Sequence, residues 1–78
     1  MQYERFRQLV INRIKELAST KNLTINQLCK KSHVSNSTIS KFLNDPRASI
    51  TLDTLEKLCY GLEIEFSDFF NTPDFNRK

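Results

Sequence analysis

The sequence has few of the residues that interrupt helices, with one glycine and two prolines among 78 residues. It also lacks the alternation of apolar and polar residues that is typical of half-buried strands, while apolar residues recur every three or four positions almost throughout. These absences exclude a strand-rich fold and predict an all-α protein, a compact helical bundle. Because this length leaves room for one hydrophobic core, we expect a single domain over residues 1–78.

No apolar run is long enough to span a bilayer, and the N-terminus lacks a signal-peptide pattern. We therefore expect a cytoplasmic protein with no membrane partner. The two cysteines, Cys29 and Cys59, lie within helical patterns, which favours buried, reduced thiols over a disulfide framework. Two cysteines and one histidine at unrelated spacings do not make a metal site, so neither a metal nor another cofactor is expected.

Catalytic residues are scarce as well. The chain has one histidine, His33, no glycine-rich phosphate loop and no paired carboxylates on one expected helix face. A cysteine nucleophile would depend on His33 as its base. The sequence thus points away from an enzyme, and it indicates no small-molecule ligand.

Charge is distributed unevenly along the chain. Residues 1–50 carry nine Lys/Arg against three Asp/Glu, a balance of +6, whereas residues 51–78 carry three against six, a balance of −3. A basic front and an acidic rear suit a domain that presents one side to phosphates. A solvated charge bias without any partner is the alternative, and charge alone does not separate the two.

Apolar spacing predicts a first helix over roughly residues 2–20. Arg5, Arg7 and Arg13 lie mostly off its buried stripe, where we expect them to add long-range attraction for a phosphate backbone. The stripe itself consists of Tyr3, Phe6, Val10, Ile14 and Leu17.

Two helix start signals follow, eleven residues apart, at Thr24 and Ser35. Gln27 completes a capping box with Thr24, and each start has an apolar residue just before it and another in the next turn. The second helix of the pair should run from Ser35 to about Asn44, after a tight turn around His33. Two short helices joined in this way predict a helix-turn-helix, whose second helix suits a DNA major groove.

The C-terminal part of the chain contains two further helix start signals of the same kind. A fourth helix is expected after the cap Thr51, with Gly61 loosening its end, and a short fifth helix after Glu65. The expected apolar face of the fourth helix is Leu52, Leu55, Leu58, Cys59 and Leu62, and Phe66, Phe69 and Phe70 should close the core. The tail, residues 72–78, should be mobile unless Phe75 docks on the domain.

Four segments in this order resemble the lambda-repressor/Cro-like family of helix-turn-helix regulators, also called XRE-type. The resemblance covers about residues 14–70 and implies a five-helix domain that binds operator DNA, usually as a two-fold dimer. Three positions depart from the family pattern: Ile25, His33 and Asp45. Ile25 replaces a glutamine that contacts phosphate and braces the reading helix, so Thr24, Asn26 or backbone amides must take its place. His33 replaces a turn glycine at a position that normally needs positive φ, and Asp45 replaces the glycine after the third helix. The segments are Ile14-Lys15-Glu16-Leu17 with Leu23-Thr24, then Val34-Ser35-Asn36-Ser37-Thr38-Ile39-Ser40-Lys41, then Thr51-Leu52-Asp53-Thr54-Leu55, and Ser67-Asp68-Phe69-Phe70.

The resemblance and the helix register together assign expected roles on DNA. Side chains opposite the buried Ile39 and Phe42 face the groove, and asparagine, serine and lysine all have hydrogen-bond partners on base edges. The alternative for Ser37 and Thr38 is that their hydroxyls satisfy backbone groups in the first helical turn. The expected base-reading residues are Asn36, Ser37, Ser40 and Lys41; the expected phosphate contacts are Thr24, Asn26, Ser35, Thr38, Asn44 and Arg47.

We therefore expect a small transcriptional regulator that binds double-stranded operator DNA, most simply a repressor acting as a homodimer on a pseudo-palindromic site. The alternative is a protein-interaction module of the same fold in which residues 35–44 contact no DNA. The dimer surface should lie in the C-terminal region, although many of its apolar side chains could belong to the core instead. The candidates are Tyr60, Leu62, Ile64, Phe66, Phe69 and Phe75.

Overall fold

The computed structural model describes residues 3–73 and residue 75, and side chains from residue 5 onward. The described residues form five helices and no strand, which confirms the all-α prediction. No helix in this part of the chain is both long and apolar enough to cross a membrane. The helices are α1 (Tyr3–Thr20), α2 (Ile25–Ser32), α3 (Asn36–Asn44), α4 (Leu52–Leu62) and α5 (Phe66–Phe69).

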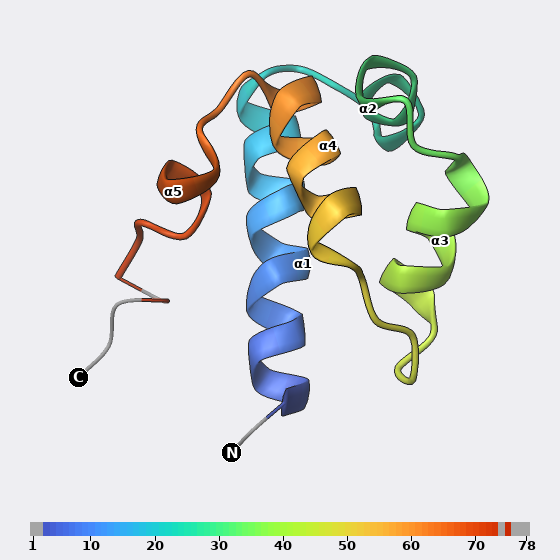
Figure 1. Ribbon diagram of the computed structural model, residues 1–78, viewed down its shortest axis with the longest axis vertical. Coiled ribbons are helices and arrows are strands. Elements are labelled where there is room, and N and C mark those ends of the chain that lie inside the picture. Colours follow the sequence, from blue (N-terminus) through green and yellow to red (C-terminus); the bar gives the residue numbers. More distant parts are fainter. Residues whose placement is uncertain (1–2, 74, 76–78) are drawn as a thin grey trace.

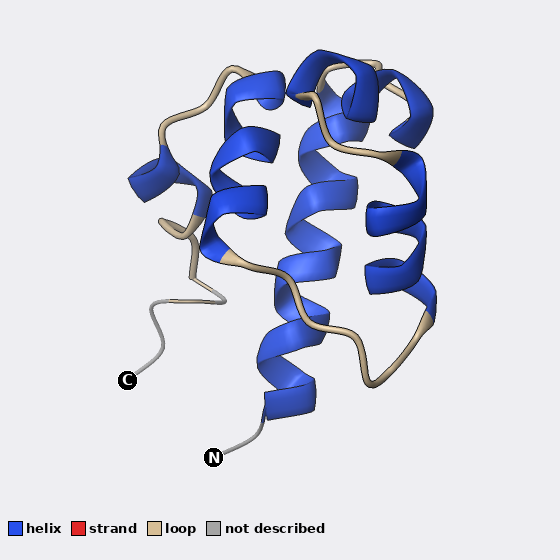
Figure 2. Ribbon diagram, turned by 45° about the vertical axis from the view of Figure 1, so that its right-hand side comes forward, coloured by secondary structure: helices blue, strands red, loops and turns tan. Residues whose placement is uncertain are grey.

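The long helix α1 runs through the middle of the molecule, with α4 beside it (Figure 1). The short α5 lies on one flank and α3 on the other, while α2 lies near the C-terminal end of α4 (Figure 1). A long loop connects the end of α3 to the start of α4 (Figure 2). Because α2 makes its most extensive helix contacts with α4, the helix-turn-helix is anchored to the rest of the domain mainly through its first helix.

Side chains from all five helices meet in one core. Ile14, Leu28, Ile39, Leu58 and Phe69 are completely buried, one from each helix. Both cysteines are buried and free, as the sequence predicts. The buried apolar residues are Val10, Ile11, Ile14, Leu17, Ala18, Leu28, Cys29, Ile39, Phe42, Leu55, Leu58, Cys59, Leu62 and Phe69.

Three expected core residues, Phe6, Leu52 and Phe66, prove to be exposed; Phe66 packs edge-on against Phe70 at the surface. Leu52 is 73% exposed because it is the first residue of α4, and burial along that helix begins one turn later at Leu55. Phe6 is 49% exposed and packs edge-on against Phe75 rather than entering the core. The expected burial of Tyr3 concerns a side chain outside the described part of the chain.

Gly61 has a packing role that the sequence analysis missed. A Cβ atom at this position would lie 2.6 Å from Ser32 Oγ and 3.0 Å from the Ser32 backbone nitrogen. Gly61 therefore permits close approach of α4 to the end of α2, and its loosening of the helix end is not its main effect. Ser32 is itself buried and donates its hydroxyl proton to the Leu28 carbonyl.

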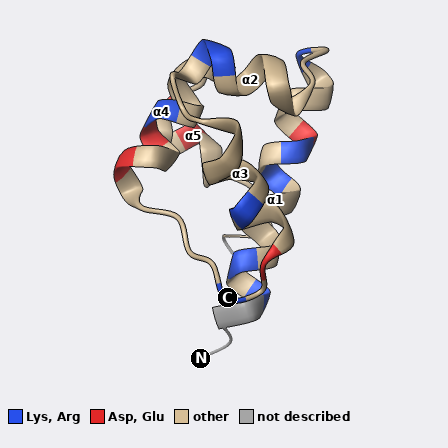
Figure 3. Cartoon of the chain, turned by 90° about the vertical axis from the view of Figure 1, so that its right-hand side faces the viewer, with Lys and Arg blue, Asp and Glu red and all other residues tan. Residues whose placement is uncertain are grey.

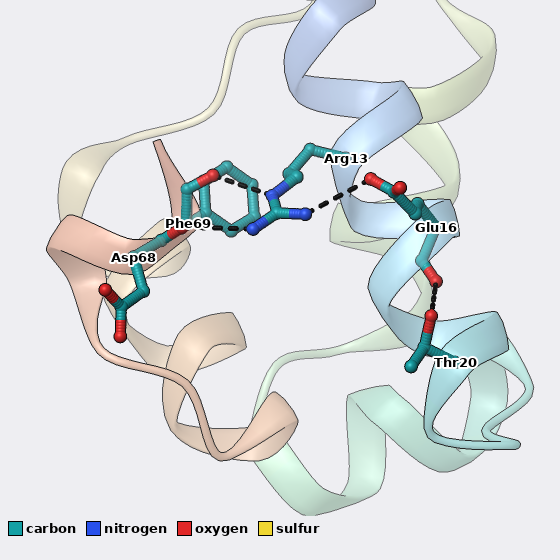
Figure 4. A network of polar contacts seen from close by, with 5 residues as sticks. All are labelled: Arg13, Glu16, Thr20, Asp68 and Phe69. Atoms are coloured by element: carbon teal, nitrogen blue, oxygen red, sulfur yellow. Dashed lines mark hydrogen bonds and ion pairs between the residues drawn. The ribbon is translucent and has the colours of Figure 1, made fainter. Parts of the chain in front are cut away.

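Arg13 joins α1 to the short α5 (Figure 4). Its Nε donates to the Phe69 carbonyl at 2.8 Å and its Nη2 to the Asp68 carbonyl at 3.0 Å, while Nη1 pairs with Glu16 at 3.2 Å. Since Glu65 makes no side-chain cap at the start of α5, this guanidinium supplies polar anchoring at the other end. The contacts of Arg13 are thus mainly internal, and its expected long-range attraction for a phosphate backbone stays a prediction.

The C-terminal aromatic residues separate into buried and surface positions. Phe69 and Leu62 are fully buried, so neither can form a dimer surface as first expected. Tyr60 is 74% exposed and Phe66 is 36% exposed. Phe75 contacts Phe70 with ring centroids 5.0 Å apart, so this part of the tail docks on the domain. The predicted mobility of residues 74 and 76–78 lies outside the described residues.

Candidate nucleic-acid interface

The turn between α2 and α3 is set by His33. This residue has φ of 60° and ψ of 36°. That is the left-handed conformation expected at a position where the resembling family has a glycine. The backbone N–H groups of His33 and Val34 both donate to the Cys29 carbonyl, which closes the end of α2. The chain then leaves α2 at a sharp angle and enters α3 after Ser35.

Side-chain caps fix the starts of both helices. Thr24 and Gln27 form the predicted capping box: the Thr24 hydroxyl accepts from Gln27 N–H, and Gln27 Oε1 accepts from Thr24 N–H. At the start of α3, Ser35 Oγ accepts from the Thr38 N–H at 3.2 Å and lies 2.7 Å from the Thr38 hydroxyl. Thr24, Ser35 and Thr38 thus take part in the contacts that cap the two helices. Each is also exposed, beside N–H groups of the first helical turn that have no partner within the helix and suit a phosphate.

The four expected base-reading residues lie on one exposed side of α3. Asn36, Ser37, Ser40 and Lys41 are all exposed, whereas Ile39 and Phe42 on the opposite side are buried. No described acidic side chain forms an ion pair with Lys41, and α3 contains no acidic residue. The helix therefore presents amide, hydroxyl and ammonium groups without a competing carboxylate of its own.

A hydrogen bond between side chains connects the two helices of the motif. Asn36 Nδ2 donates to Asn26 Oδ1, and both residues are exposed. The sequence analysis left open whether Thr24, Asn26 or backbone amides replace the missing glutamine at Ile25. Asn26 is the one of these that contacts a side chain of α3 in the described part of the chain, while the Thr24 side chain is engaged in its capping box.

The remaining two expected phosphate contacts lie around the end of α3. Asn44 Nδ2 donates to the Ser40 carbonyl at 2.9 Å and lies 3.3 Å from Ser40 Oγ, so its side chain folds back along the helix. The Arg47 side chain is 94% exposed, and its Nε lies 4.0 Å from Asp45 Oδ1. Asp45 also accepts from the Arg47 N–H at 3.0 Å, so its carboxylate turns toward Arg47.

Between α3 and the following loop lies a hollow of about 540 Å³, beside Lys41 and Arg47. Phe42 forms part of its floor, while the Thr38 hydroxyl and the two cations provide polar groups at its wall. Its lining residues are Thr38, Lys41, Phe42, Asp45, Arg47, Ala48 and Ser49.

Charge is distributed unevenly when α3 faces the viewer, although red segments also lie beside blue ones on α1 and a blue segment lies on α4 (Figure 3). Lys and Arg segments appear on α1, α2 and α3, while α4 carries red Asp and Glu segments at one side of the view (Figure 3). Lys30 and Lys31 are exposed, and Lys31 Nζ lies 3.6 Å from Glu63. Both lysines therefore lie on a solvated face of α2.

Sequence reasoning missed Arg7 as a contributor to this surface. Its guanidinium donates to the carbonyls of Phe42, Asp45 and Ala48, although α1 precedes these residues by 35 positions or more. These bonds leave the positive charge of Arg7 in place, so its expected long-range attraction stays a prediction. Helical spacing placed Arg7 off the buried stripe of α1, but no local signal identifies carbonyls so distant in the sequence as its partners.

Comparisons with known proteins agree with the geometry. The family described as Cro/C1-type HTH DNA-binding domain matches residues 13–74. The prophage Lp1 protein 11, known from a crystal structure, is similar to this chain with a TM-score of 0.82 and 30% sequence identity. The similarity covers 92% of this chain and 95% of that protein's chain. No curated protein sequence matches the chain significantly.

Proposed function

This chain belongs to the Cro/C1-type helix-turn-helix DNA-binding domain family, and from that premise we propose that it is a transcriptional regulator that reads operator DNA through α3. The observation that supports this proposal most directly is the set of polar side chains on the exposed side of α3. Asn36, Ser40 and Lys41 lie together on a helix whose other side is buried in the core. A helix held in this way can enter a major groove without rearranging the domain.

Each group on that side has a defined partner on a base edge. The Lys41 ammonium can donate to guanine O6 and N7, and an asparagine amide can pair with adenine N6 and N7. Because Asn36 gives one N–H to Asn26, its second N–H and its carbonyl oxygen remain for a base. Ser37 and Ser40 can donate to or accept from either type of base.

Phosphate contacts on both sides of α3 would set its depth and register. At one side, Thr24, Asn26, Ser35 and Thr38 surround the starts of α2 and α3, where backbone N–H groups favour an anion. At the other side lie Asn44, the last residue of α3, and the exposed Arg47 in the following loop. Contacts to the backbone position the protein, and contacts to the bases give specificity.

A domain of this size covers few base pairs, so we propose a homodimer on a pseudo-palindromic operator in the cytoplasm. Paired motifs place their reading helices about 34 Å apart, one turn of the duplex. Tyr60 and Phe66 are the exposed candidates for the dimer surface. Repression would follow when the bound dimer excludes polymerase from the operator.

The direct test is a titration of the protein with duplex DNA at two salt concentrations. Binding that neutralises phosphates should weaken steeply as salt rises, with a slope close to −0.9 per phosphate contact. Arg47→Ala should reduce that slope by about one and weaken all sequences alike. Binding that ignores salt, or no binding at all, would favour the protein-interaction alternative.

Lys41→Ala separates base reading from phosphate contact. We expect it to relax selectivity at one operator position, with a cost of about 1–3 kcal/mol on the preferred base. Lys30→Ala is the matched control, because Lys30 carries the same charge on the solvated side of α2. If Lys41→Ala weakens every sequence equally, Lys41 contacts phosphate and does not read a base.

A further inference from the structure

Arg7 makes a set of contacts that the helix-turn-helix alone does not contain. Its Nε donates to the Ala48 carbonyl at 3.0 Å, and its Nη2 donates to the carbonyls of Asp45, at 2.6 Å, and Phe42. The guanidinium carbon also lies 5.0 Å from the centre of the Phe42 ring. One side chain of α1 therefore contacts the chain at three positions spaced three residues apart.

The end of α3 needs such a donor. The last carbonyls of a helix have no partner within the helix, and a cation is favourable beside them. For Phe42 the residue four positions later is Pro46, which has no backbone N–H to offer. Arg7 supplies the missing hydrogen bond and also places its positive charge at the negative end of α3.

The three anchored carbonyls enclose two residues of the proposed interface. Asn44 lies between Phe42 and Asp45, and Arg47 lies between Asp45 and Ala48. The Arg47 side chain is 94% exposed, so the position of its guanidinium depends mainly on the position of the Arg47 backbone. Holding the flanking carbonyls therefore fixes the point from which Arg47 extends.

Arg7 is itself held firmly. Val10 and Ile11, one turn further along α1, are buried in the core, and the neighbouring Phe6 ring packs against Phe75. Arg7 also precedes the segment matched by the family, which begins at residue 13. The first turns of α1 thus add a brace that lies outside the segment matched by the family.

We propose that Arg7 is a positioning residue for DNA binding: it holds the end of α3 and the following loop so that Asn44 and Arg47 meet phosphates in register with the base-reading side chains. This inference rests on the proposed function. Arg7 does not itself contact DNA in this scheme, since its guanidinium is directed to three internal carbonyls.

Amide hydrogen exchange in the DNA-free protein tests the brace directly. In Arg7→Gln the amides of Asp45, Arg47 and Ala48 should exchange faster, because their acceptors lie within the segment that Arg7 holds. Core amides of α4 should keep their protection. Arg5→Gln, which removes an equal charge from an exposed position on the same helix, should leave the three amides unchanged. Equal exchange in the two variants would overturn the brace.

DNA titration then tests whether the brace matters for binding. Measured well below the unfolding temperature, Arg7→Gln should bind its selected duplex about tenfold more weakly, and Arg5→Gln about as well as the unaltered chain. Arg7→Lys keeps the charge but replaces the planar guanidinium, which reaches the carbonyls from two separate nitrogens, with a single ammonium nitrogen, so it should also lose affinity. It serves as the test variant if Arg7→Gln does not fold.

The outcomes separate the two proposals. Equal losses in the Arg5 and Arg7 variants, or full affinity in Arg7→Lys, would mean that Arg7 acts through its charge, which overturns the positioning role. If the unaltered chain binds no duplex, the proposed function fails and the role in DNA binding fails with it. The exchange measurement, made without DNA, still decides whether Arg7 holds the segment.

Discussion

At the scale of single residues, the helix ends show how a chain with one glycine makes its turns. Asn22, His33 and Glu63 all have φ close to 60°, at the ends of α1, α2 and α4. Side chains with a Cβ are strained in this region, asparagine less than most. The single glycine, Gly61, is not among the residues with positive φ and is used for close packing instead.

Replacing His33 with glycine should stabilise the domain by about 0.5–1 kcal/mol, because relief of left-handed strain exceeds the extra entropy of an unfolded glycine. Denaturant unfolding measures the difference. Lys31→Gly, two residues earlier inside α2, is the control and should destabilise by about 1 kcal/mol. A loss of stability in His33→Gly would show that the imidazole makes a contribution beyond occupying the turn.

Cys59 gives the domain a pH dependence on the alkaline side. Burial is the main cause that raises the pKa of this thiol to about 11 from its ordinary 9.0; nearby Glu56 raises it further and Arg13 opposes the shift. The unfolded thiol ionises near pH 9 while the folded one stays protonated, so its contribution is complete below that pH and is lost as the pH rises toward about 11.

Comparison of unfolding free energies from pH 8 to pH 11 tests this prediction. Cys59→Ala should have a lower stability throughout but a shallower decline above pH 9, since it lacks the titrating thiol. Parallel declines in the two proteins would assign the alkaline instability to other groups.

At the scale of helices, the sequence predicts the features that depend on neighbouring residues, but it does not predict contacts between residues far apart in the chain. The capping box at Thr24, the cap at Ser35 and the left-handed turn at His33 depend on neighbours in the chain, and all three are confirmed. The contacts of Arg7 and Arg13 join residues 35 to 56 positions apart, and no periodicity encodes such partners.

The exposure of Leu52 shows the same limit within one helix. Spacing correctly predicts the face that Leu55, Leu58 and Leu62 share, but it does not show where the core stops along the helix axis. The proposed interface is predictable to a similar degree. Which side of α3 is exposed follows from its apolar spacing, whereas the bond between Asn26 and Asn36 depends on the angle between two helices.

Gly61 makes the pairing of α2 with α4 testable. Gly61→Ala should destabilise the domain by about 1–3 kcal/mol, because the new methyl group would press against Ser32 Oγ, 2.6 Å away, and its backbone. The double variant with Ser32→Ala should lose less than the two single losses combined, since the nearest atom is gone. Tyr60→Ala, at the exposed neighbouring position, is the control; a loss there as large as that of Gly61→Ala would contradict the steric explanation.

At the scale of the whole molecule, the helix-turn-helix is one side of a domain whose other parts hold it in place. Arg7 fixes the end of α3 from α1, the close approach of Gly61 to Ser32 fixes α2 on α4, and Arg13 fixes α5. Most Lys and Arg residues lie in α1, α2 and α3, and acidic residues are concentrated in α4 and after it. A duplex approaching α3 therefore meets the basic part of the protein first.

The central claim, that α3 reads operator sequence, is tested most directly by selecting bound duplexes from a random pool. The account predicts one enriched site with two half-sites related by two-fold symmetry, their centres about 10 base pairs apart. It also predicts that Lys41→Ala relaxes one position in each half-site and leaves the spacing unchanged. A pool that yields no enriched sequence, or an enriched site that Lys41→Ala, Asn36→Ala and Ser40→Ala all leave unaltered, would contradict it.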